Sequence, residues 1–428
     1  MYSIADQLSK MITGNTLEEK MLILPDYDES VRSMDPATRL MRLSELEELY
    51  VPFPMACEIY TKIYLAMARS LNKKNSKDAI RQRNCNYRAM LGQKQRGVLG
   101  GSDSFTIMGP SGIGKSSALF QSINISTDNK LLRIESPHST VIPCLIIQCP
   151  HDCSVKGMLL EILHQVDMIL ESNYYERALR TRASIDMLVG SVSQAAINHI
   201  GLLVIDEIQN VCNHRNGVNL ISCLTQLINN SGISLCMVGL PETEKFFSEK
   251  MHLARRSVGL SYKALAFDRC FLGFCETVWK YQYTSKQSVF TEGVAQWLYE
   301  HSAGVVAIVV SLIKEAQEIA ILSGEEELGI RTMDLAYRQR MAALQDYIQP
   351  SVKNKSQTGV KRKKASGRAL ANGTSIKKDT GEFRRNIRKK IVKEYDGDLD
   401  HYILDHRKEE DFLSLLSEVV TVEEVKAS

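Results

Sequence analysis

One loop of the sequence has the composition of a phosphate-binding site. Gly109, Gly114, Lys115 and Ser116 fit the spacing G-x-x-x-x-G-K-[ST], and the loop follows an apolar run and precedes a helical stretch. Glycines expose successive backbone N–H groups, and a helix N-terminus adds partial positive charge. We expect Lys115 to reach the β- and γ-phosphates and Ser116 to ligate Mg²⁺. The expected nucleotide contacts are Gly109, Pro110, Ser111, Gly112, Ile113, Gly114, Lys115, Ser116 and Ser117.

Two acids follow a second apolar run. Residues 201–205 read GLLVI and are followed by Asp206 and Glu207. Asp206 is expected to hold Mg²⁺ with Ser116, and Glu207 to polarise an attacking water. Acids at a strand end can also cap the next helix, so this motif alone is weak evidence for a catalytic site. It becomes strong evidence in combination with the glycine-rich loop described above. Together the two motifs predict an ATPase, because a glutamate beside the magnesium aspartate favours hydrolysis over transfer to a hydroxyl.

A pair of arginines could supply positive charge to the γ-phosphate. Arg255 and Arg256 precede a strand expected at Tyr262, and such an arginine commonly acts on the nucleotide of a neighbouring subunit. We expect one of them to be this trans-acting finger, and the sequence does not say which. The alternative is that both are surface charges at a helix end.

The elements that must position these residues form an α/β pattern. Short apolar strands alternate with longer helical stretches, which predicts a parallel sheet flanked by helices. The expected strands are 105–108, 144–149, 202–205, 233–238 and 262–267. The expected helices are 115–125, 155–171, 174–199, 218–229 and 242–250, with an earlier amphipathic helix through residues 56–71.

Composition divides the remainder of the chain. The first 50 residues are polar and interrupted by prolines, so we expect a loosely ordered arm that docks a partner. Residues 72–101 are basic and polar, as in a connection, and about four helices after Asp268 form a small lid. The predicted domains are an arm (1–50), a nucleotide-binding domain with its preceding helix (51–268), a helical lid (269–349), a basic flexible linker (350–390) and an acidic, amphipathic partner-binding segment (391–428).

Charge and cysteine usage narrow the class of protein. The 428 residues are 44% hydrophobic with a net charge of +3, and no apolar run approaches a membrane span, so we expect a cytoplasmic protein. The charge is uneven: residues 353–390 carry a net +12 and residues 391–428 a net −7.

The ten scattered cysteines favour reduced, buried thiols. Zinc binding by Cys144, Cys149, His151 and Cys153 is the alternative, but a second spaced pair is missing.

Several stretches together resemble a known family. The layout is similar to AAA+ ATPases, and five segments resemble TnsC, the ATP-dependent regulators of TnsABC-type bacterial transposons, and the related TniB proteins. These segments are FTIMGPSGIGKSSAL, IIQCPHDCSVKGMLLEILHQVD, IGLLVIDEIQNV, ISLCMVGLPETEKF and HSAGVVAIVVSLIKEAQEIAI, within roughly residues 50–345. The resemblance implies nucleotide contacts at Gly109, Gly114, Lys115 and Ser116, hydrolytic acids at Asp206 and Glu207, and a finger at Arg255 or Arg256.

The sequence departs from the AAA+ pattern near two positions. Gly239 is followed by Leu240 where the family often has a polar sensor, so γ-phosphate sensing falls to Thr243 or is weakened. Residues 305–313, after the lid glycine Gly304, contain no arginine, as in TnsC-like proteins. A lid without this charge implies slow turnover and a long-lived ATP-bound form.

The resemblance also implies the partners. ATP-bound subunits are expected to assemble on duplex DNA as a ring or helical filament in the bacterial cytoplasm, connecting a target selector of the TnsD/TniQ type to a TnsA/TnsB-type transposase. Contacts mainly to phosphates make DNA binding sensitive to salt. The alternatives are another DNA-associated AAA+ ATPase, such as an initiator or helicase loader, and a nucleotide-dependent scaffold without significant hydrolysis. The candidate DNA contacts are Lys130, Arg133, Lys156, Arg177 and Arg180. The ordinary interpretation of each is a solvated surface charge.

Overall fold

The computed structural model describes residues 4–74, 76–90, 104–135, 138–213, 217–244 and 259–341. The chain divides into two compact units, Met1–Lys355 and Ser356–Ser428, and all described residues belong to the first. Arg255, Arg256, the predicted linker at 350–390 and the predicted partner-binding segment at 391–428 lie outside the described residues.

The elements alternate as the sequence predicts. The N-terminal part contains η1 (Ile4–Gln7), α1 (Asn15–Met21), η2 (Glu29–Ser33), α2 (Pro36–Arg42), η3 (Leu43–Glu48), α3 (Pro54–Lys74) and α4 (Lys77–Met90), where η denotes a 3-10 helix. The α/β part contains β1 (Ser104–Met108), α5 (Lys115–Thr127), β2 (Leu132–Glu135), β3 (His138–Gln148), α6 (Val155–Leu170), α7 (Tyr174–Arg180), α8 (Ile185–His199), β4 (Ile200–Asp206), α9 (Asn210–Asn213), α10 (Gly217–Ser231), β5 (Ser234–Gly239) and β6 (Leu260–Ser261). The lid contains α13 (Arg269–Trp279), α14 (Glu292–Ser302), α15 (Val306–Ser323) and α16 (Ile330–Arg340).

The sheet brings the predicted site residues to one edge. Its strand order is β2-β3-β4-β5-β1-β6, with β2 antiparallel to β3 and every other pairing parallel. Met108 at the end of β1 pairs with Gly239 at the end of β5, and Asp206 at the end of β4 pairs with Gln148. The phosphate loop and the two acids therefore start from the same carboxyl edge of the sheet.

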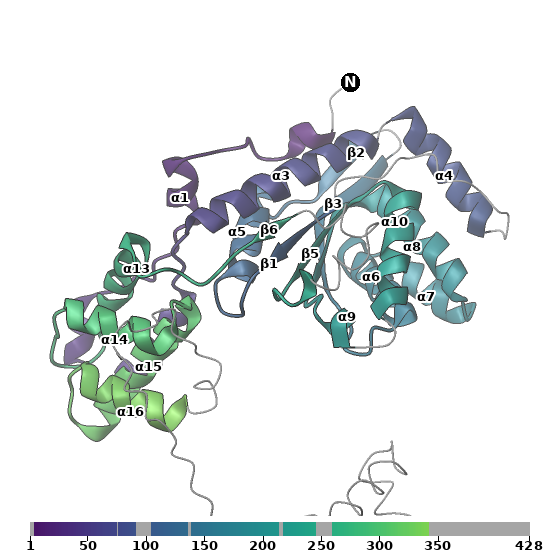
Figure 1. The fold of residues 1–428 in the computed structure, drawn as a ribbon. Helices are drawn as coiled ribbons and strands as arrows, with labels where there is room; N and C mark the ends of the chain where they lie inside the picture. Colours follow the sequence, from purple (N-terminus) through teal and green to yellow (C-terminus); the bar gives the residue numbers. More distant parts are fainter. Residues whose placement is uncertain are drawn as a thin grey trace, which may run out of the picture. The chain divides into compact units, whose positions relative to one another are not determined.

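Helices cover both faces of this sheet (Figure 1). Leu202 and Val204 of β4 face a core shared with α3 and α5, whereas Leu203 and Ile205 face a core shared with α6, α8 and α10. Such continuous apolar strands are expected when both faces are buried. The predicted three-layer α/β fold is confirmed, and β4 is fixed from both sides at the point where its acids emerge.

The N-terminal segment, residues 4–55, is folded, although the sequence predicts a loose arm at residues 1–50. Pro36 starts α2 and does not interrupt a longer helix. Val31, Leu43 and Leu46 are buried in the same core as the lid helices α13–α16. These apolar residues lack a clear period in the sequence because they lie on short turns, so their burial depends on the lid.

Four other elements differ from the sequence-based expectation. In place of the strand expected at 262–267 there is the two-residue strand Leu260–Ser261, and the backbone N–H of Leu265 donates to the carbonyl of the lid residue Gly304. The helix expected at 174–199 divides into α7 and α8, with Ser184 capping the second. Strand β2 was not predicted, and the basic connection contains α4, which packs against α8. No helix within the described ranges is both long and apolar enough to cross a bilayer.

Candidate nucleotide site

The phosphate loop is held in the conformation that its glycines permit. Gly112 and Gly114 have φ values of +78° and +93°, in the left-handed region, which glycine adopts without steric cost. The N–H of Gly109 donates to the carbonyl of Gly239 across 3.1 Å. Gly114 immediately precedes α5, so the loop lies at the N-terminus of that helix, the geometry that favours a bound anion.

Lys115 lies across the loop. Its Nζ donates to the carbonyl oxygens of Gly109 at 2.7 Å and Pro110 at 2.8 Å. Burial lowers the pKa of Lys115, and the nearby charges of Asp206 and Glu207 oppose this shift. A partly desolvated ammonium held over a phosphate-binding turn is positioned to pair with a polyphosphate.

Ser116 and Asp206 supply oxygen ligands suited to Mg²⁺. The hydroxyl of Ser116 donates to Oδ2 of Asp206 at 3.3 Å, and the other carboxylate oxygen accepts the N–H of Glu207 at 2.8 Å. Mg²⁺ prefers oxygen ligands and usually takes one or two carboxylates together with substrate phosphates. One hydroxyl and one carboxylate converging beside the loop fit this requirement.

The backbone turns sharply at the second acid. Glu207 has a φ of +56°, which is uncommon for a residue with a side chain. The turn buries Ile208, whose N–H donates to the carbonyl of Val238 at 3.0 Å, while Glu207 remains exposed. The Glu207 carboxylate accepts a hydrogen bond from Nε2 of Gln209. The general-base candidate is thus directed away from the core.

These groups line one cavity of about 510 Å³. The phosphate loop from Ser111 to Ser117 lines it together with Asp206, Glu207, Gln209, Gly239 and Leu240. The rest of the wall comes from Leu46, Glu47, Leu49, Tyr50, Val51, Phe53 and Met55 of the N-terminal segment and from Phe274, Val306, Ala307, Val310 and Ser311 of the lid. A mostly apolar wall beside a polar loop suits a flat nucleobase joined to a polyphosphate.

The structure brings together most of the predicted site residues. Ser111, Gly112, Ile113, Gly114, Lys115, Ser116, Ser117, Asp206 and Glu207 all line the cavity. Gly109 and Pro110 are not part of the lining and instead accept hydrogen bonds from Lys115. Thr243, the alternative sensor, is fully buried and is not part of the lining. Sequence reasoning missed Gln209 and the whole apolar wall, whose residues carry no motif.

Cys149 and Cys153, near the site, are buried, and Cys144 is partly buried. Burial raises the pKa of Cys144, and it raises the pKa of Cys149 to about 12, with Cys153 nearby adding to that increase. His151 is exposed. Across the described part of the chain, no three His, Cys, Asp or Glu side chains gather closely enough to hold a metal ion.

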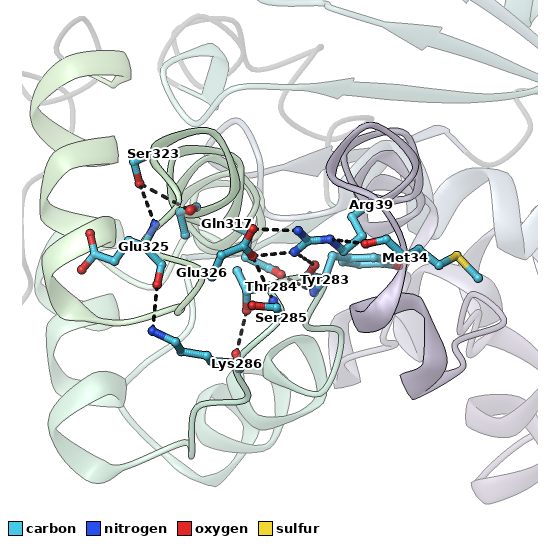
Figure 2. A network of polar contacts seen from close by, with 11 residues as sticks. Met34, Arg39, Tyr283, Thr284, Ser285, Lys286, Gln317, Ser323, Glu325 and Glu326 are labelled. Atoms are coloured by element: carbon cyan, nitrogen blue, oxygen red, sulfur yellow. Dashed lines mark hydrogen bonds and ion pairs between the residues drawn. The ribbon is translucent and has the colours of Figure 1, made fainter.

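The N-terminal segment is tied to the lid by polar contacts (Figure 2). Arg39 forms two ion-pair contacts with Glu326, at 2.5 and 2.7 Å, and donates to the carbonyls of Met34 and Tyr283, both at 3.1 Å. The lid in turn contacts the phosphate loop, since the N–H of Ala307 donates to the carbonyl of Gly112 at 3.0 Å. Two walls of the cavity are therefore joined to each other and to the loop.

The five basic residues proposed as DNA contacts lie on the surface. Lys130, Arg133, Lys156, Arg177 and Arg180 are all exposed. Lys130 lies 3.7 Å from Asp128, and Arg180 lies 2.9 Å from Glu176. Their exposure is compatible with either interpretation of these charges.

Comparison with known proteins supports the fold. Residues 99–247 match the model of the AAA domain, a range that includes the phosphate loop and both acids. With its six-stranded sheet and flanking helices, the chain has the AAA+ P-loop fold. No curated protein matches the chain.

Three solved structures are similar in fold. The Aeropyrum pernix ORC1 protein in complex with DNA has a TM-score of 0.42 at 16% identity, over 61% of this chain and 64% of that chain. Drosophila ORC bound to DNA has a TM-score of 0.42 at 15% identity, over 79% and 72%. Domain III of the Thermotoga maritima replication initiation protein DnaA has a TM-score of 0.33 at 12% identity, over 61% and 92%. The chain thus spans less than two thirds of the ORC1 structure, and each similarity is one of fold alone.

Proposed function

We propose that the protein is an ATP-dependent regulator of DNA transposition that assembles on duplex target DNA. The observation that carries the nucleotide part is the convergence of Lys115, Ser116, Asp206 and Glu207 on one cavity beside a glycine turn. The transposition part depends on the five segments that resemble TnsC and TniB, which extend beyond the nucleotide motifs.

The residues divide the work of ATP hydrolysis. Loop N–H groups and Lys115 bind the phosphates, while the apolar wall from the N-terminal segment and lid holds the base. Ser116 and Asp206 would hold Mg²⁺, which neutralises charge on the phosphates when bound. Glu207 accepts a proton from a water that attacks the γ-phosphorus, and the bond from that phosphorus to the bridging oxygen breaks to give ADP and phosphate.

Self-assembly completes the site in this proposal. Arg255 or Arg256 reaches the γ-phosphate of an adjacent copy, so subunits contact one another most tightly when ATP is bound. Hydrolysis then weakens the oligomer and removes it from DNA. A platform of this kind receives a TnsD/TniQ-type selector and a TnsA/TnsB-type transposase, the latter through residues 391–428.

Electron microscopy tests the assembly step. The full chain is mixed with duplex DNA and a non-hydrolysable ATP analogue, and we expect rings or filaments along the DNA that are missing with ADP. Raising the salt from about 50 to 200 mM should reduce DNA affinity by orders of magnitude, because the contacts are to phosphates. A chain lacking residues 391–428 should still assemble but should not capture a TnsA/TnsB-type transposase.

The outcomes separate the proposal from its alternatives. DNA assembly without capture of a transposase by the full chain would favour an initiator or loader. Assembly with ATP but no release of phosphate would favour a scaffold. DNA binding that is identical with ATP analogue, with ADP and without nucleotide would contradict all three.

A further inference from the structure

The carboxyl end of β5 provides no polar side chain to the cavity. Gly239 has none, and a Cβ built there would lie 2.7 Å from Cγ2 of Ile208 and 2.9 Å from Oε1 of Gln209. Leu240 lines the cavity but is apolar, and Thr243 is buried outside the lining. A polar side chain on this part of the cavity wall therefore comes from a neighbouring element.

Gln209 occupies the space that Gly239 leaves. It lies in the turn after β4, lines the cavity with Asp206 and Glu207, and packs its amide oxygen against the glycine. In the described part of the chain, several residues at the ends of β4 and β5 line the cavity. Gln209 is the only one of them with an uncharged polar side chain. Asn210, the next residue, donates instead to the carbonyl of Cys149 at 2.9 Å.

The nitrogen and the oxygen of the Gln209 side-chain amide differ in their hydrogen bonding. Nε2 donates to the Glu207 carboxylate, while Oε1 is buried and has no hydrogen-bond partner among the described residues. The carboxylate fixes this orientation, since the reverse would place two oxygens together. A buried acceptor without a partner is costly, so the amide gains when a new donor becomes available.

We propose that Gln209 is the γ-phosphate sensor and water-positioning residue of this site. When the triphosphate is bound, the Gln209 amide turns toward the cavity: Nε2 exchanges its bond to Glu207 for one to a γ-phosphate oxygen, and Oε1 leaves its buried position beside Gly239 and accepts a hydrogen bond from the attacking water. The released carboxylate of Glu207 takes the proton of that water as the bond to the β-phosphate breaks, giving ADP and phosphate. A glutamine that orients the attacking water is an established solution in other P-loop hydrolases. This role rests on the proposed ATP hydrolysis.

Gln209→Ala tests this role against a matched control. Gln165→Ala removes a comparable glutamine-to-glutamate hydrogen bond, from Gln165 to Glu161 at 2.8 Å, on a helix that is not part of the cavity wall. For both variants we would measure single-turnover hydrolysis and the affinities for ADP and for a non-hydrolysable ATP analogue. For Gln209→Ala we expect hydrolysis to fall by about 100-fold, the preference for the triphosphate analogue to decrease and ADP affinity to stay within about twofold. Gln165→Ala should resemble the unaltered chain.

Two results would overturn the inference. Hydrolysis by Gln209→Ala at the rate of Gln165→Ala would remove the catalytic role, and a parallel loss of ADP affinity would show that Gln209 only supports the fold. An unaltered chain that binds ATP without hydrolysing it would instead refute the proposed function, and the triphosphate preference would still decide whether Gln209 senses the γ-phosphate.

Discussion

Asp206 and Glu207 are adjacent in the sequence but have different environments. Asp206 ends a strand buried on both faces and is fixed by the serine hydroxyl and a backbone N–H. Glu207 follows with a positive φ and is exposed. The strand end therefore places the proposed metal ligand, Asp206, and the proposed general base, Glu207, in different environments although they are neighbours in the sequence.

The role of the exposed acid can be tested by removing its basicity. Glu207→Gln keeps the size of the side chain but removes its basicity, so hydrolysis should fall by about 10²- to 10⁴-fold. Affinity for ATP should be retained, because Lys115, Ser116 and the loop are unchanged. Phosphate release and nucleotide titration on the same preparation measure both quantities.

Glu242→Gln is the control for this experiment. Glu242 is an exposed acid that is not part of the cavity lining. The Glu242→Gln variant should therefore hydrolyse ATP at the rate of the unaltered chain. Full activity in Glu207→Gln would mean that another group activates the water.

Individual site residues could be predicted only where spacing fixes their chemistry. Lys115, Ser116, Asp206 and Glu207 belong to motifs whose glycines and apolar strands specify a local backbone. Gln209 could not be found this way, because its position depends on Gly239, which lies in another strand. Thr243 is a candidate γ-phosphate sensor in the sequence because it lies close to Gly239. It is buried, however, and does not line the cavity.

At the scale of elements, a buried ion pair holds the N-terminal segment to the lid. The Arg39 side chain is 4% exposed and Glu326 19%. Arg39→Met should lower the free energy of unfolding by about 3 kcal/mol, because it leaves a largely buried carboxylate without its partner. Both tryptophans of the chain, Trp279 and Trp297, lie in lid helices, so urea unfolding followed by tryptophan fluorescence reports on this part.

Arg42→Met is the matched control. Arg42 is about half exposed and lies 3.3 Å from Glu45, and exposed pairs contribute at most about 1 kcal/mol.

The hydrogen bonds from Arg39 lower the pKa of Glu326 below its ordinary value of 4.5. The contribution of the pair is therefore complete above pH 4.5 and is lost as the pH falls through the lower folded value. A difference between Arg39→Met and the unaltered chain that did not shrink in acid would assign the effect to packing.

Elements were predictable where an apolar period was long. The strands at 202–205 and 233–238 and the helix at 155–171 were found within a few residues because they bury whole faces. The N-terminal segment was not, since Arg39 and Glu326 are 287 positions apart. Its fold depends on contacts that no local pattern contains.

The candidate nucleotide cavity lies where three parts of the first unit meet. The α/β part supplies the phosphate loop and acids, and the N-terminal segment and lid supply the apolar wall. The hydrogen bond from Ala307 to Gly112 joins the lid to the loop directly. A nucleotide bound here would contact all three parts. ATP binding would therefore stabilise their positions relative to one another.

Calorimetric titration of the full chain with a non-hydrolysable ATP analogue in Mg²⁺ tests whether ATP binds in this cavity through Lys115. Lys115→Ala should lose about 3 kcal/mol of binding, roughly 100-fold in affinity, whereas Lys130→Ala, which alters an exposed lysine, should bind as the unaltered chain does. Fluorescence of the lid tryptophans confirms that both variants are folded. Equal affinity in folded Lys115→Ala and Lys130→Ala would contradict the assignment of this cavity to ATP.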